Sequence, residues 1–113
     1  GIDESLVVHM EDVEWCQRIT QAGYTITLEP SIMVTHLGGK STKRFSQGAL
    51  LSQHLHGLWV FHHKHYPASW WMVRTALTLG MGMRSLAYLL LGRLQMSHAY
   101  GAAVCLLLCS ATL

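Results

Sequence analysis

The sequence contains no acidic residue after Glu29. All six carboxylate side chains lie in the first 29 residues, and every formal charge beyond that point is positive. The net charge of +2 at pH 7 therefore hides an acidic head and a basic, apolar tail. This asymmetry suggests two different tasks on one chain.

Several other features are also missing. The three cysteines, Cys16, Cys105 and Cys109, form no CxxC pair, which favours reduced thiols in a cytoplasmic setting over a disulfide framework. No basic segment precedes an apolar run at the start, so we expect no signal peptide and an internal or C-terminal piece of a longer protein. The 113 residues make one domain at most. The basic residues lack an interleaved aromatic strip, which argues against nucleic-acid binding.

The head, residues 1–66, has the pattern of an α/β fragment. Apolar residues at three- and four-residue spacing predict a helix over about 11–22, and Gly23 suits its C-terminal end. Glu14 precedes Arg18 by four residues, as in a surface ion pair. "YTITL" (24–28) and "IMVTH" (32–36) predict two short strands around an "EPS" turn. Two strands are too few to close a sheet alone.

The tail, residues 67–113, is predicted to be helical and partly membrane-associated. Leucines at helical spacing predict an earlier helix up to Tyr66, which Pro67 ends. Arg74, Arg84 and Arg93 then interrupt an apolar stretch, so we expect breaks near Gly80–Gly82 and Gly92. The charge-free run from Leu94 approaches the roughly 20 residues of a spanning helix. We expect residues 68–113 to lie on a membrane surface with the arginines at lipid phosphates. Core helices packing on a missing partner domain are the alternative.

Two neighbouring carboxylates, Glu11 and Asp12, mark the start of the first predicted helix. They lie about 100° apart on a helix, so both cannot address one site. We expect one to face a cleft while the other stabilises the positive helix N-terminus.

The order of several short motifs resembles a known enzyme family. The motifs are a G-x-D-E opening (Gly1, Asp3, Glu4), E-D-V-E-W-C-x-R over 11–18, the A-G-Y and E-P-S turns, and H-x-G-G-x-S-T from His36. Over about residues 1–66 the sequence resembles the C-terminal half of the catalytic domain of family-2 glycosyltransferases, which have the GT-A fold. Within that family it is most similar to bacterial rhamnosyltransferase-like enzymes of cell-envelope polysaccharide synthesis.

The resemblance implies a function and a set of site residues. Asp12 would be the catalytic base of an inverting transfer, and Glu11 would hold the acceptor or orient a loop. His36 would lie near the donor diphosphate or its divalent metal, Mg²⁺ or Mn²⁺. The donor would be a nucleotide sugar, the acceptor a glycan or polyprenol-linked hydroxyl, and the location the cytoplasmic face of the plasma membrane. The substrate-binding residues would be Trp15, Arg18, Gly38, Gly39 and Lys40.

The sequence also departs from the family pattern. Asp3 and Asp12 are its only aspartates, so it has no D-x-D metal motif, and the N-terminal nucleotide-binding βαβ units are missing. We therefore expect the piece to be inactive alone. A small membrane-anchored interaction module is the alternative from another class. Docking alone, however, gives no reason for the acid pair, the His36 loop and both turns to occur together.

Histidines between positions 54 and 65 form a second candidate site. His54, His62 and His65 fall near one face of the predicted helix, and His62 and His65 could share a metal. No carboxylate or cysteine lies nearby in the sequence to complete such a site. A charge-neutral polar face is the simpler interpretation.

Overall fold

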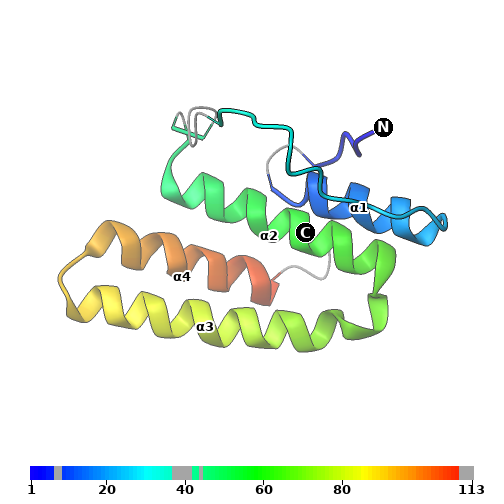
Figure 1. The fold of residues 1–113 in the computed structure, drawn as a ribbon. Helices are drawn as coiled ribbons and strands as arrows, with labels where there is room; N and C mark the ends of the chain where they lie inside the picture. The colour runs from blue at the N-terminus through cyan, green and yellow to red at the C-terminus, as the bar shows by residue number, and fades with distance from the viewer. Residues whose placement is uncertain (7–8, 37–41, 44, 110–113) are drawn as a thin grey trace.

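The computed structural model describes residues 1–6, 9–36, 42–43 and 45–109. Its elements are α1 (Glu11–Gln21), α2 (Gln47–His65), the single 3₁₀ turn η1 (Pro67–Ser69), α3 (Trp70–Leu90) and α4 (Leu94–Cys109). Figure 1 shows α2, α3 and α4 running side by side, with α1 beyond α2 on the side away from α3.

Helices α3 and α4 form an antiparallel pair. The turn at 91–93 joins them, and Gly92 adopts φ 69°, a left-handed conformation that glycine takes without steric cost. Arg74, near the start of α3, donates hydrogen bonds to the backbone carbonyls of Leu107 and Leu108. Carbonyls at the end of a helix otherwise lack partners. The Arg74 guanidinium therefore ties the end of α4 to the start of α3.

Helix α2 packs on this pair through a small apolar core. The buried members of the core are Leu55, Met81, Ala103 and Leu107, and Leu51, Leu77, Tyr100 and Val104 pack against them. These residues come from α2, α3 and α4. Helices on both sides of residue 66 therefore share one core.

Several predicted helix ends are confirmed. Helix α1 covers all but the last residue of the predicted range 11–22, and Gly23 follows with φ 84°. Helix α2 ends at His65, two residues before Pro67. The chain also turns at Gly92 as predicted. Glycine, proline and the spacing of apolar residues were therefore sufficient to predict these helix ends.

The predicted α/β class, a piece of a GT-A fold, is wrong for the described residues, which contain helices and no strand. Residues 24–28 and 32–36 have no regular secondary structure. Leu28, Met33 and Val34 in these segments are 91%, 92% and 86% exposed. Two short strands are marginal unless further strands or a helix cover their apolar side. With those side chains in solvent, the β-branched pattern has nothing to pack against.

The predicted break near Gly80–Gly82 is also wrong, because α3 runs without interruption from Trp70 to Leu90. A glycine inside a helix costs only about 0.5–1 kcal/mol relative to alanine. Packing of α3 against α4 offsets that cost. None of the described helices is both long enough and apolar enough to cross a bilayer.

Candidate functional site

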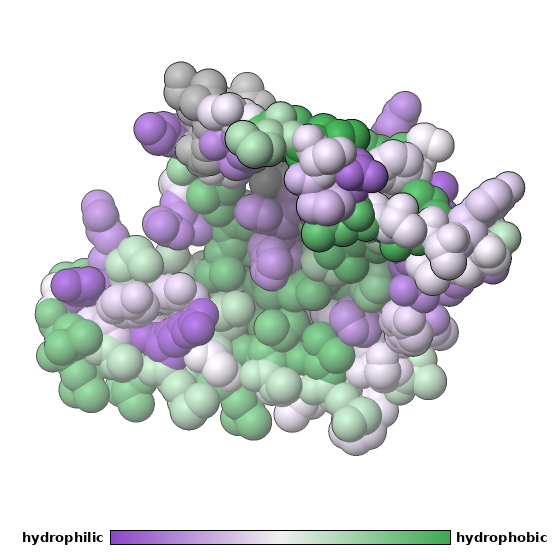
Figure 2. All heavy atoms as spheres, in the orientation of Figure 1, coloured by the Kyte–Doolittle hydropathy of each residue, from purple (hydrophilic) through white to green (hydrophobic). Residues whose placement is uncertain are grey.

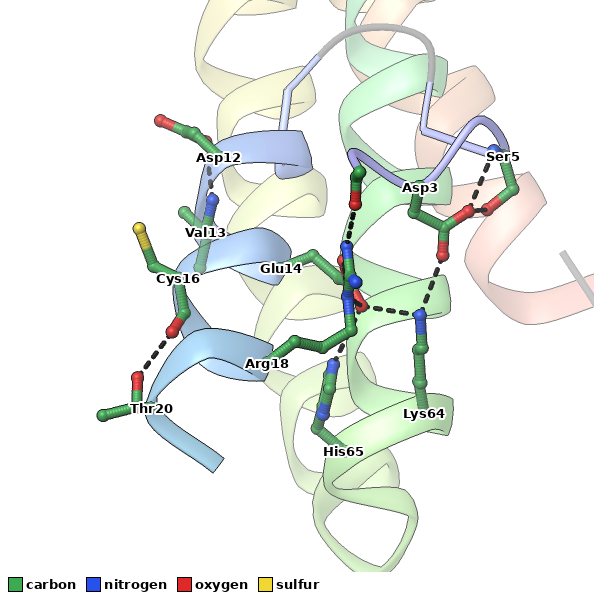
Figure 3. A network of polar contacts seen from close by, with 11 residues as sticks. Asp3, Ser5, Asp12, Val13, Glu14, Cys16, Arg18, Thr20, Lys64 and His65 are labelled. Carbon is green, nitrogen blue, oxygen red and sulfur yellow. Dashed lines mark hydrogen bonds and ion pairs between the residues drawn. The ribbon is translucent and has the colours of Figure 1, made fainter. Parts of the chain in front are cut away.

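A fully buried carboxylate, that of Glu14, lies where α1 meets the end of α2 (Figure 3). The Nε of Arg18 donates to both of its oxygens, at 3.0 and 2.9 Å. From α2, the Nζ of Lys64 lies 2.6 Å from Glu14 Oε1, and Nε2 of His65 lies 3.3 Å from the same oxygen. A buried charge is stable only when it is paired and hydrogen-bonded. Glu14 therefore needs these partners from both helices.

The same network binds the first residues of the chain. The Nζ of Lys64 also lies 2.9 Å from Asp3 Oδ2, and the hydroxyl of Ser5 donates to Asp3 Oδ1 at 2.7 Å. The Nη2 of Arg18 donates to the carbonyl oxygen of Gly1 at 2.6 Å. Hydrogen bonds from Ser5 and Lys64 hold the pKa of Asp3 well below its usual range. The network thus joins residues 1–5, α1 and α2.

The electrostatics of the network favour its ionised form. Burial opposes ionisation of Glu14, but hydrogen bonds from Lys64, Arg18 and His65 outweigh burial and lower its pKa. Contacts with Glu14 first, and then with Asp3, raise the pKa of Lys64 above its ordinary value. The cluster is therefore a charged structural anchor at neutral pH.

The predicted catalytic acids lie at the first turn of α1. Asp12 is exposed, and its Oδ1 accepts a hydrogen bond from the backbone N–H of Val13 at 2.8 Å. Glu11 is half-buried, and its Oε2 is enclosed with no hydrogen-bond partner among the described residues. Figure 3 shows Asp12 on the side of α1 away from Glu14. The two neighbouring acids thus have different surroundings, as their spacing predicts.

The backbone leading into the acid pair is strained. His9 and Met10 both have positive φ, 68° and 70°, which non-glycine residues rarely adopt. They lie against Gly57 of α2, where an added Cβ would be 3.1 Å from both the carbonyl oxygen of His9 and Cγ of Met10. A side chain at position 57 would displace this segment. Gly57 therefore sets how closely the start of α1 approaches α2.

We expect Gly57→Ala to lower the free energy of unfolding by about 1–3 kcal/mol, because the new methyl group overpacks a backbone contact. Gly80→Ala in α3 is the matched control, since open space surrounds its Cβ. That change should raise stability by about 0.5–1 kcal/mol through helix propensity. Urea unfolding followed by circular dichroism measures both. A stabilised Gly57→Ala protein would show that residues 9–10 do not pack on α2.

A cavity of about 260 Å³ lies beside this segment, between α2 and α4. His9 and His54 line it, with ring centroids 5.3 Å apart in an edge-to-face arrangement. Burial, and then the electrostatic influence of the neighbouring His9 side chain, lower the pKa of His54. Tyr100 of α4 also lines this cavity.

Two of the predicted substrate-binding residues lie on α1. Trp15 is exposed and lies three residues after Asp12, so the two share a side of the helix. Arg18 instead directs its guanidinium to Glu14 and Gly1. The structure therefore brings Trp15 together with Asp12, while Arg18 has a structural role.

His36 is exposed in a segment without regular structure. In the part of the chain that the structure describes, no three His, Cys, Asp or Glu side chains gather into a possible metal site. The divalent ion expected near His36 stays a prediction. The remaining predicted binding residues, Gly38, Gly39 and Lys40, lie outside the described residues.

Comparisons with protein-family models, curated proteins and solved structures found no match. No family is assigned to the chain on that basis. The functional interpretation therefore rests on its residues and their geometry.

The anchoring network was not predicted from the sequence. The spacing of Glu14 and Arg18 predicted a surface ion pair, whereas Glu14 is buried and the apolar side chains of Val13 and Trp15 are 45% and 43% exposed. Lys64 has no local signal, because it lies 50 residues after its main partner. One signal was available in the sequence: α2 contains no acidic residue, and its last turn is rich in basic residues that could pair with an acid elsewhere in the chain.

The histidines of α2 have different surroundings. Nδ1 of His62 lies 2.9 Å from the carbonyl of Leu58, and Nδ1 of His63 lies 3.0 Å from that of Trp59. His65 belongs to the Glu14 network. The helix thus uses these imidazoles in local hydrogen bonds and in the ion network.

Proposed function

We propose that this chain supplies the acceptor side of an inverting glycosyltransferase, with Asp12 as the general base. One observation carries the proposal: an exposed carboxylate, that of Asp12, lies at the first turn of a helix whose position is fixed by an ion network around the buried Glu14. A catalytic base must be held close to its productive geometry, and a helix anchored in this way holds it.

The proposed reaction is a single displacement. The carboxylate of Asp12 removes the proton of an acceptor hydroxyl, and that oxygen attacks the anomeric carbon of a nucleotide-activated sugar. The glycosidic bond forms as the bond to the diphosphate oxygen breaks, and the nucleoside diphosphate leaves. Attack from the opposite face inverts the configuration. The proton then passes from Asp12 to solvent. The base must lie about 2.6–3.2 Å from the hydroxyl oxygen.

Contacts between motifs support the proposal. The G-x-D-E opening and the E-D-V-E-W-C-x-R helix, which carry the resemblance, meet in the structure. Asp3 and Glu14 share Lys64, and Arg18 binds the carbonyl of Gly1. Two of the motifs that carry the resemblance are therefore also in direct contact in the folded chain. The proposal rests on this pattern and not on a GT-A fold.

The exposed apolar side chains of the head are also consistent with it. Val13 and Trp15 on α1, with Leu28 and Met33 after it, are large apolar side chains in solvent. In the proposed enzyme the donor-binding part covers the side of α1 that carries Trp15 and places the sugar near Asp12.

The test is transfer by the complete product of the reading frame. The assay offers a panel of nucleotide sugars and a polyprenol-linked glycan with Mg²⁺ or Mn²⁺. We expect nucleoside diphosphate release that depends on the acceptor, with inverted anomeric configuration by NMR. Transfer with retained configuration, or no transfer from any donor of the panel, would contradict the proposal.

A further inference from the structure

The outer side of α3 carries a continuous apolar stripe. Five side chains that are 57–79% exposed form it: Met72, Leu79, Met83, Leu86 and Leu90. At about 100° per residue these positions fall within about 60° of one another. Figure 2 shows apolar side chains along the lower edge of the molecule, where Figure 1 places α3. The stripe follows nearly the whole helix and faces away from the core.

Exposed apolar residues extend the stripe at both ends. Trp71, 67% exposed, flanks its beginning. Leu91 and Leu94, at the turn into α4, are 70% and 56% exposed. Tryptophan is enriched at the headgroup level of membranes, where an apolar ring with a polar N–H fits best. The stripe is thus apolar along the length of α3, with a tryptophan next to its beginning and leucines at its end.

The arginines of the tail lie outside the stripe. Arg74 and Arg84 are about 80° apart around α3, and both lie roughly 130–150° from the centre of the stripe, on the side of the helix that faces away from it. Arg74 donates hydrogen bonds to the carbonyls at the end of α4, and its expected contact with a lipid phosphate stays a prediction. Arg84 lies 5.8 Å from the ring centroid of Tyr100 and remains exposed. Arg93, at the turn, is also exposed.

We propose that α3 lies flat on an anionic lipid surface, with the stripe in the acyl boundary. The uncharged stripe supplies the apolar contribution to binding, and Arg93, exposed at the turn next to Leu91 and Leu94, supplies the attraction to anionic headgroups. No acidic residue opposes this attraction after Glu29. This complementarity of charge favours a lipid surface over an apolar protein partner. The 21 residues of α3 span about 30 Å in the plane of the interface.

The test measures binding of the full chain to vesicles. The stripe variant is Leu79→Glu with Met83→Glu. Its matched control is Leu28→Glu with Met33→Glu, which places the same charges at equally apolar, exposed positions before α2. All four positions are exposed, so both variants should keep the parent circular dichroism spectrum. Sedimentation with vesicles of phosphatidylglycerol and phosphatidylethanolamine gives the partition coefficient.

We expect the stripe variant to lose about tenfold or more in partition and the control to stay within about twofold of the parent. Salt should release the parent only partly, because the apolar contribution is not screened. Equal binding by both variants would overturn the proposal. A parent dimer in solution that the stripe variant converts to a monomer would also overturn it, since a second copy would then cover the stripe. The result is independent of transferase activity.

Discussion

Replacing Asp12 by Asn is expected to lower the turnover of the complete enzyme by about 10²–10⁴-fold. The amide keeps the shape of the side chain but cannot accept the proton of the acceptor hydroxyl. Its carbonyl oxygen can still accept the hydrogen bond from the backbone N–H of Val13. Because Asp12 is exposed, stability should change little. Steady-state kcat and thermal unfolding of the same preparation measure the two effects.

Two further variants separate catalysis from structure. Asp3→Asn makes the same chemical change inside the ion network, so it should lower stability and leave kcat near the parent value. Glu11→Gln should raise KM for the acceptor more than it lowers kcat, because the proposed role of Glu11 is to hold the acceptor. If Asp12→Asn turned over within about threefold of the parent, Asp12 would not be the base.

The sequence predicted helix existence and helix ends better than it predicted which side of a helix is buried. Apolar spacing and Gly23 located α1 within one residue. Val13 and Cys16, two of the apolar residues that carry this spacing, are nevertheless exposed, and Glu14 is buried. Which side of α1 is buried depends on Lys64, which is distant in the sequence. Because Lys64 pairs with Glu14, the side of α1 that carries Glu14 is the more favourable one to bury. Local periodicity carries no information about such a partner.

The strand predictions failed for a related reason. Residues 24–28 and 32–36 have the alternation of strands, but alternation describes a side chain pattern and does not supply a neighbouring strand. Leu28 and Met33 remain in solvent. Strand formation depends on pairing, whereas a helix satisfies its backbone within one segment. This difference explains why α2, α3 and α4 were predictable as helices while the β segments were not.

Glu14→Gln is expected to lower the free energy of unfolding by about 2–3 kcal/mol. Removing one partner of a buried ion pair typically costs about 3–5 kcal/mol, because the other charge is left buried without compensation. The side chains of Arg18 and Lys64 are 35% and 40% exposed, so water screens part of that loss and the effect is smaller. Urea unfolding at neutral pH measures it.

Glu4→Gln is the matched control, since it makes the same change at an exposed position in the same head. It should shift stability by less than about 0.5 kcal/mol. Equal losses in the two variants would mean that the Glu14 network contributes nothing specific. A selective loss at Glu14 would show that the network carries the attachment of α1 to α2.

The same network predicts how stability depends on pH. The pKa values of Glu14 and Asp3 are lowered by folding, so the folded state binds fewer protons than the unfolded chain in acid. Their stabilisation is present above the ordinary carboxylate pKa of about 4 and is lost as pH falls towards the folded values. Lys64 acts in the opposite direction, because its raised pKa gives stability that is present below about pH 10.4 and lost above it.

Stability should therefore be nearly constant from about pH 5 to 9 as far as these three groups are concerned, and should decline on the acid side. In Glu14→Gln the acid decline should be shallower, because position 14 then takes up no proton on unfolding. Urea unfolding from pH 2 to 7, in steps of about one unit, compares the two slopes. Parallel acid slopes in parent and variant would contradict a lowered pKa of Glu14 in the folded state. A steeper parent slope requires that the carboxylate is charged where it is buried, and hence that Lys64, Arg18 and His65 surround it in solution.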